Sequence, residues 1–96
     1  MRIIGGKYKS YIIPTSKKIK ARPTTDMAKE ALFNILENKI DFNQIYVLDL
    51  FCGTGNISYE FASRGVKEIT AVDHQINALQ FIQKQSSHWG MNINTK

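Results

Sequence analysis

The sequence predicts an α/β fold built on a parallel sheet, and three stretches of the chain carry that prediction. Residues 45–51 form an apolar, partly β-branched run, which is typical of a buried strand in such a sheet. The run leads into the tight turn Gly53-Thr54-Gly55 and then into a segment with helical spacing of its apolar residues. A second strand-like run, residues 68–73, ends on the acid Asp73. This order is typical of a nucleotide-type cofactor site at the carboxyl ends of parallel strands.

Two segments precede the central strand. Residues 2–13 are expected to form two short strands bent around Gly5-Gly6, or a hairpin with its turn near them, and a polar basic loop follows Pro14. A helix then begins at one of three good N-cap residues, Thr24, Thr25 or Asp26, and ends near Asn38. Its predicted apolar stripe is Ala28, Ala31, Leu32, Ile35 and Leu36.

Two helices are expected after the glycine turn. The first is capped by Asn56, has an apolar side of Ile57, Phe61 and Ala62, and ends at Gly65. The second runs from about Gln75 to His88, with Ile76, Leu79 and Ile82 turned inward, and ends at Gly90. Residues 91–96 have the pattern of a third strand. We therefore expect a basic β arm over residues 1–21 and the first half of a Rossmann-like domain over residues 22–96.

The charges around the glycine turn indicate which cofactor the site takes. Ser58 stands where a dinucleotide fingerprint has its third glycine, and no Lys-Ser/Thr pair follows the glycines, as a triphosphate-binding loop would need. Asp49 lies on the strand ahead of the turn, where a carboxylate repels pyrophosphate and attracts a cation. The ammonium and sulfonium of S-adenosylmethionine fit that sign. Asp73 follows Gly55 by 18 residues, close to the spacing of about 20 at which an acid meets ribose hydroxyls.

Composition limits the class of protein. With 96 residues the chain is at most one small domain, and a doubly wound fold of this type needs nearly twice that length. The single cysteine, Cys52, excludes an internal disulfide and fits a cytoplasmic setting. No run approaches the length of a membrane span, no signal peptide is visible, and no metal site is predicted.

The net charge of +5 is concentrated at the start of the chain, since residues 1–30 carry +6 and residues 31–96 carry −1. A basic arm beside a neutral domain indicates a polyanionic partner such as RNA or DNA, and a merely solvated surface is the alternative. Lysines interleaved with a tyrosine suit phosphate contact and base stacking, although Tyr8 and Tyr11 could equally pack on their own sheet. The residues predicted to bind the polyanion are Arg2, Lys7, Tyr8, Lys9, Arg22 and Thr24.

Four motifs in this order resemble one known family. They are the N-terminal Met1–Lys9, the block Arg22-Pro23-Thr24-Thr25-Asp26, the helix segment Glu30–Leu36, and the turn that begins at Leu48-Asp49-Leu50-Phe51. The chain resembles the bacterial 16S rRNA guanine-N2 methyltransferases over nearly its whole length, least after residue 75. The resemblance implies a Rossmann-like fold, S-adenosylmethionine as donor, and ribosomal RNA in a small-subunit assembly particle as substrate. The residues predicted to bind the donor are Asp49, Phe51, Cys52, Gly53, Thr54, Gly55, Asn56, Asp73 and His74.

The resemblance also implies what this stretch lacks. In that family an Asn/Asp-Pro-Pro-aromatic turn holds the target amine, and the 96 residues contain no Pro-Pro pair. We therefore predict no catalytic residue here and expect the stretch alone to be inactive. The open edge of the strand at 45–51 is expected to pair with another copy or with the missing half. Two other classes stay open, a nucleotide- or NAD-binding Rossmann enzyme and a non-catalytic RNA-binding module.

Overall fold

The two predicted strand runs lie side by side in a parallel sheet. The computed structural model describes residues 1–20 and 24–96. Strand β1 (Tyr46–Leu50) pairs along its whole length with β2 (Glu68–Val72), and β2 pairs with the short β3 (Asn94–Thr95), giving the order β1-β2-β3. Both expected strands and the predicted approach to a third are thereby confirmed, and the α/β fold class with them.

The helices begin and end close to the predicted positions. They are α1 (Asp26–Glu37), α2 (Asn56–Ser63) and α3 (Ile76–Trp89), with a short 3-10 turn, η1 (Phe42–Gln44), before β1. Thr25 caps α1, because its hydroxyl accepts the Ala28 N–H at 3.1 Å. At the other end of the chain, Gly90 closes α3 in the left-handed conformation that favours glycine.

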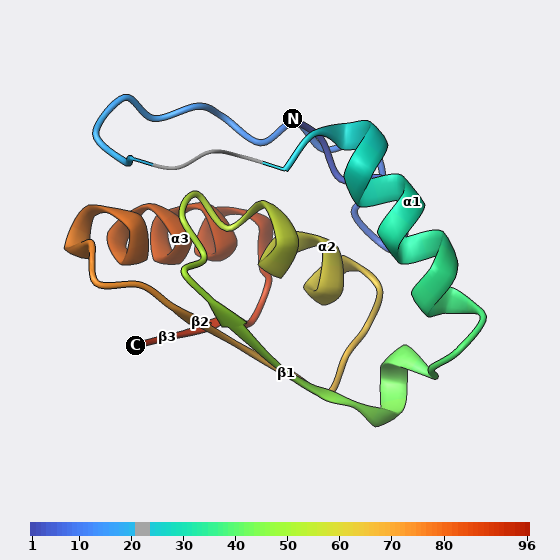
Figure 1. Ribbon diagram of the computed structural model, residues 1–96. Coiled ribbons are helices and arrows are strands. Elements are labelled where there is room, and N and C mark those ends of the chain that lie inside the picture. Colours follow the sequence, from blue (N-terminus) through green and yellow to red (C-terminus); the bar gives the residue numbers. More distant parts are fainter. Residues whose placement is uncertain (21–23) are drawn as a thin grey trace.

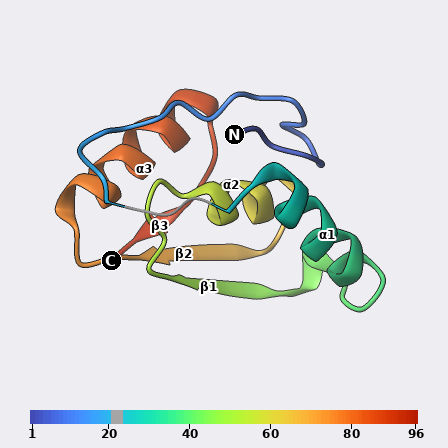
Figure 2. The same ribbon diagram turned by 45° about the horizontal axis from the view of Figure 1, so that its top comes forward.

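The helices among the described residues cover one face of the sheet (Figures 1 and 2). Helices α2 and α3 lie on that face, and residues 1–20 run across their outer side, away from the strands. The core between these layers consists of Ile3, Ile13, Cys52, Tyr59, Ile69, Ala71, Ile82, Met91 and Ile93. The N-terminal segment therefore contributes to the same core as the strands and helices.

Strand β1 is less buried than the sequence predicts. Tyr46, Leu48 and Leu50 are 71%, 62% and 57% exposed, because they point to the face on which no described element packs. The expectation of a buried strand is wrong for this face, and the expectation that β1 forms an open edge of the sheet is confirmed for the described residues. No helix among these residues combines the length and apolar character that a membrane span needs.

The buried side of α1 also differs from the prediction. Lys29 and Phe33 are its buried residues, whereas Leu32 and Ile35 of the predicted stripe are 41% and 56% exposed. The physical reason is that Phe33 packs edge-on against Phe61, with ring centroids 4.7 Å apart, and this contact sets the rotation of the helix. The hydrophobic pattern alone favoured a side about a third of a turn away around the helix.

The inward faces of α2 and α3 need corrections of the same kind. Helix α2 buries polar residues such as Ser58 and Glu60, while its predicted apolar side is only half-buried, because α2 is enclosed by the sheet and the N-terminal segment. In α3 the inward position of Ile82 is confirmed, but Ile76 is 70% exposed since it lies in the first turn, at the rim of the molecule.

The N-terminal segment forms a loose antiparallel hairpin without regular strands. Arg2 and Ile12 make an isolated antiparallel bridge, and the chain between them turns over residues 5–10. The turn sits directly on α2: the Lys7 N–H donates to the Ser63 carbonyl at 2.8 Å. At Gly6, with φ of 82°, a Cβ would collide with that same carbonyl, so this close approach requires glycine.

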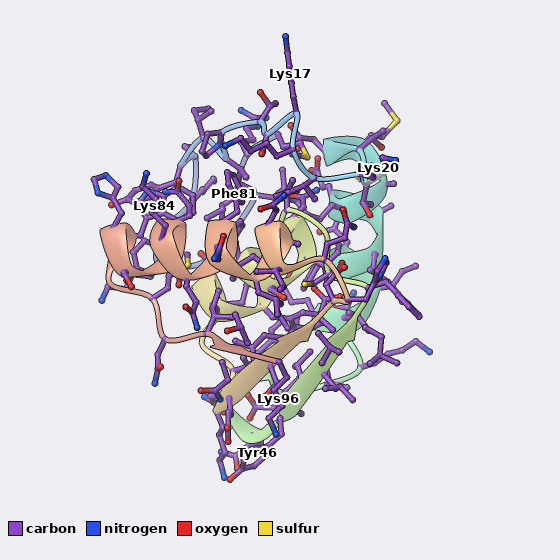
Figure 3. The ribbon with its side chains drawn as sticks, turned by 90° about the vertical axis from the view of Figure 1, so that its left-hand side faces the viewer. Lys17, Lys20, Tyr46, Phe81, Lys84 and Lys96 are labelled. Atoms are coloured by element: carbon purple, nitrogen blue, oxygen red, sulfur yellow. The ribbon has the colours of Figure 1, made fainter. Side chains whose placement is uncertain are left out.

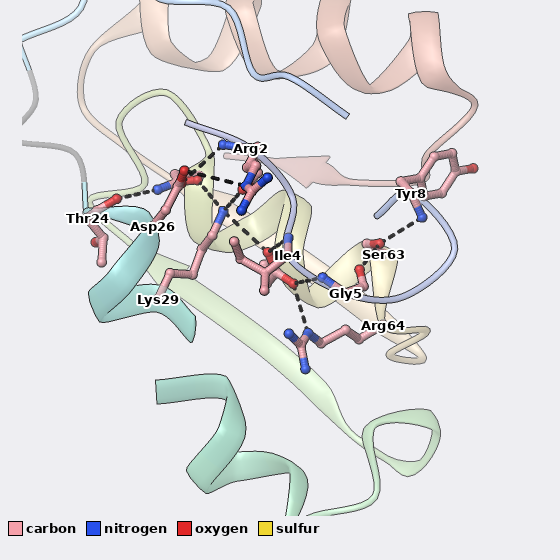
Figure 4. A network of polar contacts seen from close by, with 11 residues as sticks. Arg2, Ile4, Gly5, Tyr8, Thr24, Asp26, Lys29, Ser63 and Arg64 are labelled. Carbon is pink, nitrogen blue, oxygen red and sulfur yellow. Dashed lines mark hydrogen bonds and ion pairs between the residues drawn. The ribbon is translucent and has the colours of Figure 1, made fainter. Parts of the chain in front are cut away.

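A buried carboxylate holds the segment in place (Figure 4). Glu60 on α2 is fully buried and accepts the N–H groups of Ile4 and Gly5 at 2.9 and 3.0 Å. The Arg64 guanidinium donates to the same carboxylate at 2.8 Å, and the Lys29 ammonium of α1 lies 3.3 Å from it. One side chain thereby joins the hairpin, α1 and α2.

Replacing Glu60→Gln is expected to lower the free energy of unfolding by about 3 kcal/mol, because it leaves the Lys29 charge buried without its counter-charge. Chemical denaturation of the 96-residue chain measures this loss. The exposed Glu37→Gln removes the same charge from the end of α1 and should change stability by less than about 0.5 kcal/mol. Equal losses in the two variants would contradict a central role for the buried pair.

Candidate cofactor site

A cavity of about 300 Å³ opens where β1 and β2 end. Its volume lies at the lower end of the range for small-molecule sites, about 300–1,000 Å³. It is lined by Lys20, Thr24, Asp49, Phe51, Cys52, Gly53, Thr54, Asn56, Ile57, Asp73, His74 and Gln75. The cavity thus brings together every residue predicted to bind the cofactor except Gly55, from segments that are far apart in the sequence.

Asp73 directly follows β2 and holds the glycine turn. Its Oδ2 accepts the Gly53 N–H at 2.9 Å, and its Oδ1 accepts the Gln75 N–H at 2.9 Å. Burial acts to raise the pKa of this carboxyl, but these N–H donors outweigh it and the pKa lies below its ordinary value. Asp73 is therefore a carboxylate at neutral pH, and it faces the cavity with its position fixed by the turn.

Asp49 has a structural partner that the sequence did not predict. Its Oδ2 accepts the hydroxyl of Ser58 at 2.6 Å, which ties β1 to the first turn of α2. Ser58 is fully buried, so the residue at the third glycine position serves this contact. Burial raises the pKa of the Asp49 carboxyl, although its hydrogen bonds to Ser58 act in the opposite direction. A cation in the cavity would favour the charged form of this carboxyl.

Gly55 permits close packing and does not line the cavity. Its φ is 88°, and a Cβ here would come within 2.8 Å of Ile82 on α3 and 3.0 Å of the Tyr59 ring. The need for glycine at this position is therefore explained by packing, because a side chain here would collide with α3. The contact with a cofactor stays a prediction.

The prediction that Asn56 caps α2 is wrong. Gly55 occupies the N-cap position, and the Asn56 amide instead joins two other segments. Its Oδ1 accepts from the Lys29 ammonium at 2.7 Å, and its Nδ2 donates to the Thr24 carbonyl at 2.7 Å. Asn56 binds Lys29 because the buried ammonium needs hydrogen-bond acceptors. The Asn56 Oδ1 atom is one acceptor, and the Arg2 carbonyl is another.

Two residues at the end of β1 line the cavity in different ways. Cys52 is buried in the core, in agreement with simple packing in the turn. Phe51 has a φ of 57°, which is rare for a residue with a side chain, and the residue is 82% exposed. Such backbone conformations cost about 1–3 kcal/mol and cluster at functional sites.

The residues predicted to bind RNA do not gather in one place. Thr24 lines the cavity, and Arg22 lies outside the described residues. Lys7 and Tyr8 lie beside Lys67 and Ile69, at the amino end of β2 and thus at the opposite end of the strands from Asp73. Tyr8 also packs edge-on against Tyr11, at 5.2 Å, which agrees with the alternative of a structural tyrosine.

Sequence reasoning missed two polar residues at the cavity, Lys20 and Gln75. The Gln75 side chain makes two hydrogen bonds to the backbone of Lys20. Its Oε1 atom accepts the Lys20 N–H, and its Nε2 atom donates to the Lys20 carbonyl, each at 2.9 Å. Gln75 could have been noticed from its place two residues after Asp73, at the start of a helix. Nothing local marks Lys20, which reaches the cavity only through the fold.

The parallel strands, the glycine turn and the two acids at the strand ends define a Rossmann-like protein. A sequence model of the family described as Conserved hypothetical protein 95 matches residues 1–96. The chain belongs to this family, as the predicted resemblance to small-subunit rRNA methyltransferases implied.

Relatives and a solved structure agree with this assignment. The chain is 44% identical to the uncharacterized methylase RP545 of Rickettsia prowazekii, over 76% of this chain and 34% of that protein. It is 36% identical to ribosomal RNA small subunit methyltransferase D of Buchnera aphidicola, over 88% of this chain and 42% of that protein. The Escherichia coli protein yhhF, which carries a provisional methyltransferase name, superposes with a TM-score of 0.85 at 29% identity, over 100% of this chain and 51% of its own. The chain thus spans about half or less of each of them.

Cys52 is expected to be unreactive in the folded chain. Burial, with the nearby charges of Asp49 and Asp73, raises the pKa of its thiol to about 12, so the reactive thiolate is scarce until the pH approaches that value. Iodoacetamide at pH 8 should modify the native chain far more slowly than the chain in guanidinium chloride. Equal rates, under conditions where the native chain is folded, would contradict this burial.

Proposed function

We propose that this chain is the donor-binding part of an S-adenosylmethionine-dependent methyltransferase that acts on ribosomal RNA. The observation that carries the proposal is the pair of acids that face one cavity from the ends of two neighbouring strands. The names of the curated relatives support the reaction class and the substrate. Methylation of the N2 amine of a guanine in 16S rRNA is the finer form of the proposal, and it rests on the family resemblance.

The residues present fit the donor. Asp73 offers carboxylate oxygens to a ribose diol, and its low pKa keeps it an acceptor at neutral pH. Asp49 offers a negative charge to the ammonium of the methionine part. When bound, S-adenosylmethionine supplies a methyl group activated by its positively charged sulfur. The chain's own residues bind and orient the donor, and the proposal assigns no catalytic residue to them.

Methyl transfer also requires the accepting amine to be held in line with the methyl group. We propose that this half of the reaction depends on residues outside this chain, so the chain alone should bind the donor without turnover. The exposed side chains of β1 and its open edge would suit pairing with such a partner or with a second copy. An enzyme acting on ribosomal RNA would work in the cytoplasm, where the small subunit assembles.

Calorimetric titration tests the donor site. We expect S-adenosylhomocysteine to bind the chain and NADH not to bind, because Asp49 disfavours a pyrophosphate. Asp73→Ala should weaken S-adenosylhomocysteine binding by about tenfold or more, since two charge-assisted hydrogen bonds are lost. The exposed Asp41→Ala is the control with the same charge change. Binding of NADH in place of S-adenosylhomocysteine would favour the dinucleotide class, and binding of neither would favour a plain RNA-binding module.

RNA binding tests the basic arm. We expect the double variant Lys7→Ala/Lys9→Ala to weaken binding of a short RNA hairpin and to reduce the salt slope of log K by about 1.4 if both lysines contact phosphate. Fluorescence anisotropy at several salt concentrations measures both quantities. An unchanged slope would make this part of the arm a solvated surface, and the RNA would then have to contact the chain elsewhere.

A further inference from the structure

A basic loop, residues 15–20, reaches the cofactor cavity at its last residue, Lys20. Its three lysines, Lys17, Lys18 and Lys20, are exposed, and Ile19 between them is buried, which anchors the loop. Figure 3 shows that Lys17 projects away from the body of the molecule, at the opposite end from Tyr46. Of these lysines, Lys20 lines the cavity at the donor end of the strands, and Lys17 and Lys18 precede it in the same loop, whereas Lys7 lies at the other end of the strands.

A single side chain fastens this loop to the cofactor site. Gln75 accepts the Lys20 N–H and donates to the Lys20 carbonyl, so it fixes both the position and the orientation of that peptide backbone. The backbone N–H of Gln75 donates to Asp73 Oδ1 at 2.9 Å. Lys20, Gln75 and Asp73 all line the same cavity. The loop and the predicted ribose-binding acid are therefore connected through one residue.

We propose that Gln75 couples the cofactor cavity to the basic loop, so that a ligand bound at Asp73 raises the affinity of Lys17, Lys18 and Lys20 for RNA phosphates. This coupling rests on the proposed function. Gln75 is a positioning residue here, because it acts on RNA through the loop that it holds.

The contacts at Asp73 give the sign of the coupling. The Gln75 Nε2 atom is shared between the Lys20 carbonyl, at 2.9 Å, and Asp73 Oδ1, at 3.4 Å. The amide carries two N–H groups, so it bridges the loop backbone and the acid. A ligand that fixes Asp73 therefore also restricts Gln75 and the loop it holds, so RNA loses less conformational entropy on binding. This effect favours RNA binding in the presence of the cofactor.

The test is a linkage measurement on the 96-residue chain. The dissociation constant of a short fluorescein-labelled RNA hairpin is measured with and without saturating S-adenosylhomocysteine, and the ratio of the two is the coupling factor. We expect a factor of about 5 or more, the lower end of typical couplings. Gln75→Glu keeps the length of the side chain but replaces the donor Nε2 by an acceptor, and should bring the factor to about 1.

A matched control separates this effect from the added charge. Gln80→Glu places the same negative charge on an exposed position of α3, away from the cavity, and should keep the native coupling factor. The double variant Lys17→Ala/Lys18→Ala should weaken RNA binding and lower its salt slope by about 1.4, while its affinity for S-adenosylhomocysteine stays native. Lys39→Ala/Lys84→Ala, which removes two exposed lysines elsewhere, should affect RNA binding less.

The outcomes distinguish this proposal from the proposed function. Native coupling in Gln75→Glu, or a factor of 1 in the unaltered chain, would overturn the coupling and leave the donor site intact. Failure of S-adenosylhomocysteine to bind the unaltered chain would overturn the proposed function and the coupling with it. If Gln75→Glu does not fold, amide hydrogen exchange of the unaltered chain serves as the test. We expect S-adenosylhomocysteine to slow exchange of the Lys20 N–H, which donates to Gln75. An unchanged exchange rate would reject the proposal.

Discussion

The rest of the structure depends on the contacts that the buried carboxylate of Glu60 makes. A carboxylate has about four acceptor positions, and this one meets two backbone N–H groups, a guanidinium and an ammonium. Without it the N–H groups of Ile4 and Gly5 would lose their acceptor in a partly buried site, at a cost of about 1–3 kcal/mol each. The Lys29 ammonium extends the network to Asn56, and so to the wall of the cofactor cavity. The fold of the N-terminal segment and the shape of the site therefore share one source of stability.

The two acids at the cavity hold the segments around it in place. Asp73 fixes the glycine turn, and Asp49 fixes the first turn of α2, each through a hydrogen bond shorter than 3 Å. A carboxylate held in this way pays little conformational entropy when it binds a ligand, because its rotamer is already set. The same bonds keep the turn in the conformation that opens the cavity. The site is thus organised by its own candidate ligand-binding residues.

Among the described residues, two groups of N-terminal lysines lie apart. Lys7 lies at the amino end of β2, and the basic loop of residues 15–20 ends at Lys20, which lines the cavity at the carboxyl end. A long, flexible polyanion can contact both groups, whereas only the second lies near the place where a methyl donor would bind. The charge asymmetry of the sequence predicts a polyanion but does not separate these groups, since all of these lysines lie within the first 20 residues.

The sequence alone determined the strands, the glycine turn, the helix ends and the two acids, because each depends on residues that are close along the chain. Spacing and capping placed Gly65 and Gly90 after their helices and the start of α1 at Thr24, Thr25 or Asp26, and the two parallel strands brought Asp49 and Asp73 to one cavity. Only the tertiary structure decided which faces are buried. Phe33 and Lys29 replaced the predicted stripe of α1, Asn56 bound Lys29 instead of capping α2, and Gln75 joined Lys20 across 55 positions of sequence. These choices depend on contacts between distant segments, whose geometry no local pattern of residues encodes.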